Sequence, residues 1–185
     1  MEGIRAEVVL QGPEACPVAA ASAGTDESLT GITWTGYSNG TVTEQVTAPS
    51  EPAIDGAEEV FDYGSRSVYE FERERDRPCA CEFVEDTAGP VTEVHSREGS
   101  LYLTLHVRDV KRLRSVVGGL REQFGSVSVE YLVRGRDPAS EEAAIVPVDL
   151  ARLTDRQREV IETAHEMGYF AYPRQSNAQE VATAL

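Results

Sequence analysis

The sequence contains almost no lysine. Lys111 is the single lysine, and the remaining sixteen of the 17 basic residues are arginines. Together with 32 aspartates and glutamates they give a formal net charge of −15. We expect such an acidic surface in a cytosolic protein from an extreme halophile, because molar salt screens the repulsion between carboxylates. An ordinary acidic protein from a GC-rich genome is the alternative.

Long apolar runs and the marks of secretion are also missing. No stretch approaches the ~20 apolar residues that a membrane span needs, and the first residues lack the basic start and apolar core of a signal peptide. Three cysteines are too few, and odd in number, for a disulfide scaffold. We therefore expect a cytoplasmic protein that does not act at a membrane.

The common enzyme motifs are absent as well. The sequence has no glycine-rich dinucleotide loop, no Walker loop, no nucleophile elbow and no zinc-protease motif. The pair Gly118-Gly119 falls inside a predicted helix, where it indicates close packing and not a phosphate site. We expect that the protein is not an enzyme.

Residues 1–135 predict an α+β fold. Alternating apolar residues, with period two, indicate a strand at 4–10. Turn signals between short runs indicate three hairpins, with strands at 29–34 and 41–46, 60–63 and 67–71, and 79–84 and 91–95. A short helix begins at Pro17. Residues 100–134 form a strand–helix–strand unit, whose helix Asp109 caps and Gly125 ends. The prediction is an antiparallel or mixed sheet with about two packed helices.

A polar, aperiodic stretch at residues 137–144 indicates a linker. We place the domain boundary at 147, with an α+β sensor or dimerisation domain at 1–147 and a short helical segment at 148–185. Thr154 and Gln157 form a capping box for a first helix that ends at Gly168, and Ser176 caps a second one. Taken alone, this pattern indicates only a helical hairpin.

The amino-acid sequence of this segment resembles that of a known family. Residues 153–157, 168–170, 172–174 and 176–182 closely resemble the helix-turn-helix of the bacterio-opsin activator family, which are transcription regulators of halophilic archaea. Residues 16–19, 79–82 and 103–106 are similar to the N-terminal domain of that family. The resemblance implies a DNA-binding transcription regulator. Its expected partners are DNA and the transcription machinery, and a second copy of the chain is a candidate partner.

The sequence departs from the family at its end. In the family a recognition helix follows the second helix, and recognition helices carry the contacts to base edges. Here the sequence stops at Leu185, so we expect an incomplete helix-turn-helix. The arginines that we expect to contact DNA are Arg156, Arg158 and Arg174, and phosphate contacts position a protein without reading sequence.

The three cysteines are the best candidates for chemistry in the N-terminal domain. Cys79 and Cys81 would share one face of the predicted strand 79–84. Cys16 precedes Pro17 at a predicted helix start, where the helix dipole favours a thiolate. His95, on a strand predicted to pair with 79–84, is the expected fourth ligand. This set would bind zinc. Two alternatives remain open: buried core cysteines, or a redox sensor with a reversible disulfide.

The sequence thus leaves two readings of function. The first is a transcription regulator with an N-terminal sensing or dimerisation domain. The second is a metal- or small-molecule-sensing module that acts through protein contacts, with terminal helices that are only structural. The signal, the operator and the direction of regulation do not follow from the residues.

Overall fold

The computed structural model describes residues 3–13, 16–36, 40–135, 153–170 and 174–185. The chain divides into two compact units, Met1–Ser140 and Glu141–Leu185. The boundary expected at residue 147 lies outside the described residues. No helix in the described part of the chain is long and apolar enough to cross a membrane.

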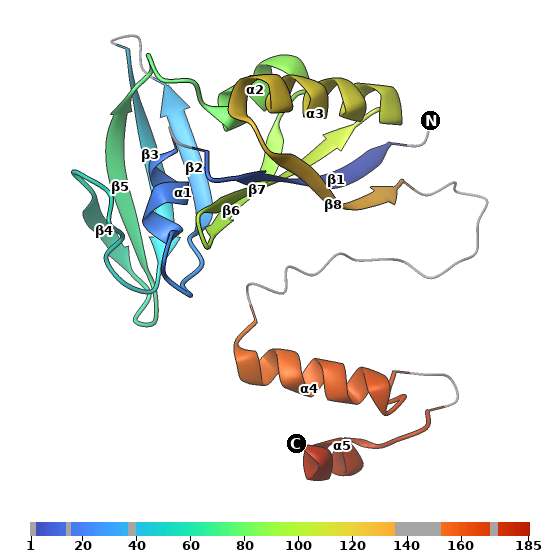
Figure 1. Ribbon diagram of the computed structural model, residues 1–185. Helices are drawn as coiled ribbons and strands as arrows, with labels where there is room; N and C mark the ends of the chain where they lie inside the picture. The colour runs from blue at the N-terminus through green and yellow to red at the C-terminus, as the bar shows by residue number, and fades with distance from the viewer. Residues whose placement is uncertain (1–2, 14–15, 37–39, 136–152, 171–173) are drawn as a thin grey trace. The chain divides into compact units, whose positions relative to one another are not determined.

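The N-terminal unit contains a four-stranded sheet, sheet A, in the order β6-β7-β1-β8. Its strands are β1 (Ile4–Gln11), β6 (Val91–Arg97), β7 (Ser100–Val107) and β8 (Val127–Arg134). All neighbouring strands are antiparallel. Helices α2 (Ala80–Thr87) and α3 (Val110–Phe124) lie on one face of this sheet (Figure 1). The chain order β1, α2, β6, β7, α3, β8 is that of a ferredoxin-like βαββαβ unit.

A second sheet, sheet B, is inserted between β1 and α2. Its strands follow the order β2-β3-β5-β4. The inserted elements are α1 (Pro17–Ser22), β2 (Thr30–Gly36), β3 (Thr41–Ala48), β4 (Glu58–Asp62) and β5 (Ser67–Glu74). An isolated bridge between Leu29 and Ser96 joins the insertion to β6 of sheet A. The hydroxyls of Ser22 and Ser96, 2.6 Å apart, tie α1 to the same strand.

One hydrophobic core fills the N-terminal unit. Alternate residues of β1 and β7 supply its centre, and α3 adds Leu113, Val116, Val117 and Leu120. Asp109 caps α3, since its carboxylate accepts from the Arg112 N–H at 2.8 Å, and Gly125 follows the last turn with φ +88°. The α+β prediction and the strand–helix–strand unit at 100–134 are confirmed.

The strand predicted at 79–84 is wrong, because this segment begins α2. The buried residues are Ala80, Cys81 and Val84, spaced i, i+1, i+4 as on one face of a helix. The segment was predicted as a strand from the turn signal that follows it, and so short an apolar run does not distinguish a strand from a helix. The cysteines therefore lie at a helix start and not on a strand face.

The C-terminal unit contains α4 (Asp155–Glu166) and α5 (Ala178–Ala184). The capping box of Thr154 and Gln157 is confirmed. The cap predicted at Ser176 is wrong: Asn177 caps α5, because its side chain accepts from the N–H groups of Gln179 and Glu180. A carboxamide oxygen is a strong N-cap acceptor, so the helix begins one residue later.

Candidate functional site

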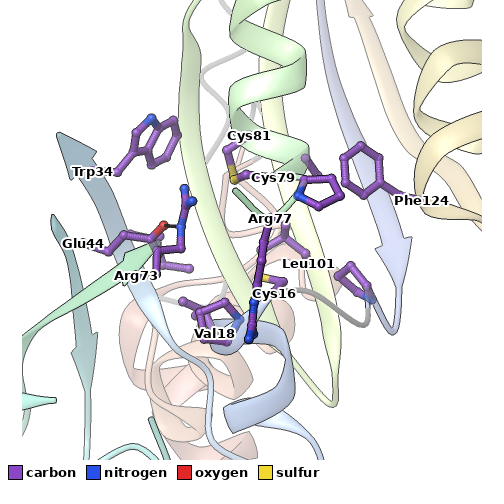
Figure 2. A pocket seen from close by; sticks show the side chains of 15 residues that line it. Cys16, Val18, Trp34, Glu44, Arg73, Arg77, Cys79, Cys81, Leu101 and Phe124 are labelled. Carbon is purple, nitrogen blue, oxygen red and sulfur yellow. Dashed lines mark hydrogen bonds and ion pairs between the residues drawn. The ribbon is translucent and has the colours of Figure 1, made fainter. Parts of the chain in front are cut away.

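The three cysteines line one pocket, formed by sheet B, the starts of α1 and α2, and β7 (Figure 2). Cys16 and Cys79 are the N-cap residues of α1 and α2, and Cys81 lies in the first turn of α2. Trp34 of β2 lines the same pocket. The cavity measures about 30 Å³, which is room for one or two water molecules.

The local sequence explains why the thiols meet there. Pro17 stands at the first position of α1, which places Cys16 in extended backbone immediately before the helix. Cys79 has extended dihedral angles too, and its carbonyl accepts the first bond of α2 from the Phe83 N–H at 3.0 Å. The insertion of sheet B brings the two helix starts together at one pocket.

Cys79 is the acidic thiol of the three. A hydrogen bond from the Cys81 thiol is the main cause that lowers the pKa of Cys79 to about 7. The Glu82 N–H and the charge of Arg73 lower it further, against the effect of burial. The thiolate form of Cys79 is therefore favoured relative to that of an ordinary cysteine, and the thiolate is the nucleophilic form.

The other two thiols stay protonated. The hydrogen bond to Cys79 and burial raise the pKa of Cys81 well above its ordinary value. Burial raises the pKa of Cys16 to about 11, although the Ala19 and Val18 N–H groups act in the opposite direction. The sequence prediction that a helix start makes Cys16 a thiolate is wrong, because burial outweighs the helix N–H groups.

A buried ion cluster adjoins the thiols, and the sequence argument missed it. Arg73 of β5 donates to Glu44 of β3 and, at 2.7 Å, to Glu82 of α2. Burial alone would lower the pKa of Arg73, but these two hydrogen bonds hold it above its usual value. Burial raises the pKa of Glu44, and Arg73 offsets part of that rise. The cluster fixes a positive charge beside Cys79.

A sequence signal for this cluster does exist. Glu44 lies on the same face of β3 as the core residues Val42 and Val46. Arg73 lies on the same face of β5 as the buried residues Tyr69 and Phe71. An acid and a base at core positions of two strands predict a buried pair, because an isolated buried charge is too costly.

The structure does not bring His95 to the cysteines. β6 pairs with β7, and His95 stands opposite Tyr102, with ring centroids 4.5 Å apart. The pocket side of β7 is the side of Leu101, and successive residues of a strand point to opposite faces. The predicted hairpin, which would have placed His95 beside Cys79, is therefore wrong.

The described residues contain no group of three or more His, Cys, Asp or Glu arranged to hold a metal ion. Binding of zinc by Cys16, Cys79 and Cys81 stays a prediction, without His95 as the fourth ligand.

The three arginines predicted to meet DNA belong to the C-terminal unit. Arg156 is exposed and pairs with Glu159 at 2.8 Å. Arg158 lies two residues further along α4 and is half-buried. Arg174 is exposed and its guanidinium lies over the Tyr169 ring, 4.7 Å from the centroid.

Comparison with known proteins accounts for both units. Residues 1–135 match the family described as "DmsR, N-terminal domain-like". Residues 153–185 match the family described as "HTH DNA binding domain". The chain belongs to the DmsR-like family of transcriptional regulators. This agrees with the resemblance to bacterio-opsin activator-type regulators.

Two relatives support the assignment. The chain is 38% identical over 187 residues to the transcriptional regulator NarO of Haloferax volcanii, covering all of this chain and 87% of the relative. It is 34% identical over 82 residues to the dimethyl sulfoxide reductase transcriptional activator of Halobacterium salinarum, covering 43% of this chain and 37% of the relative. The chain is a DNA-binding transcription regulator, so the reading with merely structural terminal helices is set aside.

Proposed function

We propose that this regulator senses oxidants at Cys79 and that oxidation of Cys79 changes the DNA-binding activity of the C-terminal unit. The observation that carries the proposal is that three thiols line one pocket. A hydrogen bond from Cys81 lowers the pKa of Cys79 there, and the pKa values of Cys81 and Cys16 are raised. A thiolate attacks an oxidant, and a neighbouring thiol then reacts with the product.

The chemistry with a peroxide is balanced. The Cys79 thiolate attacks one oxygen of hydrogen peroxide, the O–O bond breaks, and hydroxide leaves to become water by taking up a proton. Cys79 is then a sulfenic acid. The Cys81 sulfur, hydrogen-bonded to Cys79 in the reduced state, attacks the Cys79 sulfur and displaces a second water. Two thiols and one peroxide give one disulfide and two waters.

The size of the pocket favours this chemistry over recognition of a small molecule. The cavity has a volume of about 30 Å³. Pockets that bind small molecules are much larger, with volumes of roughly 300–1,000 Å³. Arg73 stabilises the reactive thiolate, and its bonds to Glu44 and Glu82 connect α2 to sheet B. A change at Cys79 therefore acts on contacts between two parts of the N-terminal unit.

The single tryptophan gives a direct experiment. Trp34 lines the cysteine pocket, so its fluorescence reports the reaction. With about one equivalent of hydrogen peroxide per chain, we expect a fluorescence change and a Cys79–Cys81 disulfide in peptide mapping. Cys79→Ser should show neither, whereas the control Cys16→Ser should show both. Wild-type thiols that survive the treatment, or stoichiometric zinc that protects them, would refute the proposal.

We further propose that Arg156, Arg158 and Arg174 contact DNA phosphates and that the bound regulator acts on the transcription machinery. The stacking of Arg174 on Tyr169 supports this, because it orders an exposed guanidinium before binding.

The association constant K for DNA falls as salt rises, so the slope of log K against log salt concentration is negative. If Arg174 contacts a phosphate, Arg174→Ala should make this slope shallower by about 0.9. Titrations of labelled duplex DNA at several KCl concentrations measure this slope. The control Arg108→Ala, an exposed arginine of the N-terminal unit, should leave it unchanged. Equal slopes for the two variants would show that Arg174 does not contact a DNA phosphate.

A further inference from the structure

One face of sheet A is open. The residues Ile4, Ala6, Val8 and Leu10 of β1 belong to the same core as the buried residues of α2 and α3. These two helices lie on one face of sheet A (Figure 1). The alternate residues of the four strands point the other way. Among the described residues of the N-terminal unit, no helix covers this second face, which we call the open face.

The side chains of the open face are already ordered. Tyr102 stacks on His95 with an angle of 9° between the rings. Arg5 donates to Glu93 at 2.9 Å and lies 5.6 Å from the centroid of the Tyr131 ring. Val9, at the middle of the face, is only 4% exposed. Ordered side chains lose little entropy on association, which favours the use of this face as an interface.

The charge of the open face differs from that of the whole molecule. Its ionised residues are Arg5 and Arg97 against Glu7, Glu93 and Glu130, by the strand register and the hydrogen bond of Glu130 to Ser128. Two bases against three acids leave a net charge of −1. The chain as a whole carries −15. Two copies of so acidic a protein repel each other over most of their surfaces. The open face is where two copies approach at little electrostatic cost.

A second exposed patch lies on β4, the edge strand of sheet B. Phe61 and Tyr63 are 56% and 68% exposed there. The same strand carries three acids, Glu58, Glu59 and Asp62, and no base. Pairing of two β4 edges would bring acids against acids, and like charges directly opposite are destabilising in a sheet. The charge pattern therefore disfavours self-association through β4.

The size of the open face suits a reversible dimer. Four strands of seven or eight residues span about 25 Å by 19 Å. Two such faces bury about 1,000 Å², near the lower limit of specific interfaces. Two-fold pairing is the commonest assembly of soluble proteins, and helix-turn-helix dimers bind paired half-sites on DNA.

We propose that the chain forms a two-fold dimer in which the open face of sheet A packs against the open face of a second copy. The dimer uses Tyr102, Tyr131 and Val133 as its apolar contacts and the mixed charges around them as its rim. This proposal does not depend on the redox role of the cysteines.

Sedimentation equilibrium of the full reduced chain in molar KCl tests the interface. We expect wild type to dimerise at micromolar concentrations, and Tyr131→Asp with Val133→Asp, both half-buried on the open face, to raise the dissociation constant at least about tenfold. The matched control Phe61→Asp with Tyr63→Asp adds the same charge to the β4 patch and should dimerise like wild type. Circular dichroism melts establish that both variants are folded.

The remaining outcomes overturn the proposal. A monomeric wild type at 100 µM or so would show that the open face does not bind a second copy. Loss of the dimer in the β4 variant alone would assign the interface to sheet B. Equal dimerisation of all three proteins would place it elsewhere. If the Tyr131/Val133 variant is unfolded, His106→Glu, an exposed position on the same face, replaces it with the same expected result.

Discussion

The three cysteines in the pocket differ in acidity, with the pKa of one thiol lowered and those of two raised. Cys79 is held near its titration point, while Cys81 and Cys16 are held as neutral thiols. The difference arises from neighbours and not from residue type, because the same hydrogen bond lowers one pKa and raises the other. Such a division of roles is what a nucleophile and a resolving thiol require.

Replacement of Cys81 tests this division. Loss of its hydrogen bond should move the pKa of Cys79 upward from about 7 toward the ordinary value of 9.0. Less thiolate is then present at neutral pH, so the rate of Cys79 alkylation by iodoacetamide should fall in Cys81→Ala. Mass spectrometry measures the rate of Cys79 alkylation at a series of pH values, and the midpoint of that curve gives the pKa of Cys79. In the control Cys16→Ala the midpoint should stay near 7, and an unchanged midpoint in Cys81→Ala would disprove the assigned cause.

At the scale of elements, α2 and α3 pack closely because α3 contains Gly119. A Cβ at this position would lie 2.5 Å from the tip of the Phe83 ring. That ring is held edge-on against Phe124 at 6.1 Å. The neighbouring Gly118 has no atom within 4 Å of its would-be Cβ. Close packing explains the first glycine and not the second.

The two glycines predict opposite effects of one substitution. Gly119→Ala should destabilise the fold by about 1 kcal/mol or more, because overpacking costs about 1–3 kcal/mol and exceeds the gain in helix propensity. Gly118→Ala should stabilise it by about 0.5–1 kcal/mol. Urea unfolding of both variants at one salt concentration measures the difference. Equal changes for the two would show that the helices do not pack as described.

Elements with a long, clean period were predictable from the sequence. β1, β7 and the strongly amphipathic α3 follow their expected bounds closely. The helix α2 was not predictable, since eight residues suit either period and its packing depends on α3 and β6, which are distant in sequence. The sequence did not predict the buried ion cluster, because Glu44 is one of 32 acidic residues and its residue type alone does not distinguish it. Its position on the buried face of β3 was the available signal.

At the scale of the whole molecule, the chain combines a ferredoxin-like unit with a large insertion and a helix-turn-helix segment. The sequence identified the family and the three cysteines. It also predicted that Cys16, at a helix start, would lie near Cys79 and Cys81, and the three do line one pocket. It did not predict that Cys79 begins a second helix. Nor did it place His95 on the opposite face of sheet A, which depends on strand order.

The most direct test of the central claim is the DNA affinity of the full chain in its two redox states. Fluorescence anisotropy with one labelled DNA duplex at fixed KCl concentration measures it before and after peroxide, and again after dithiothreitol. The account predicts a reversible change of at least about fivefold, the lower range of allosteric coupling, and no change in Cys79→Ser. Equal affinity in both states, or the same change in Cys79→Ser, would contradict it.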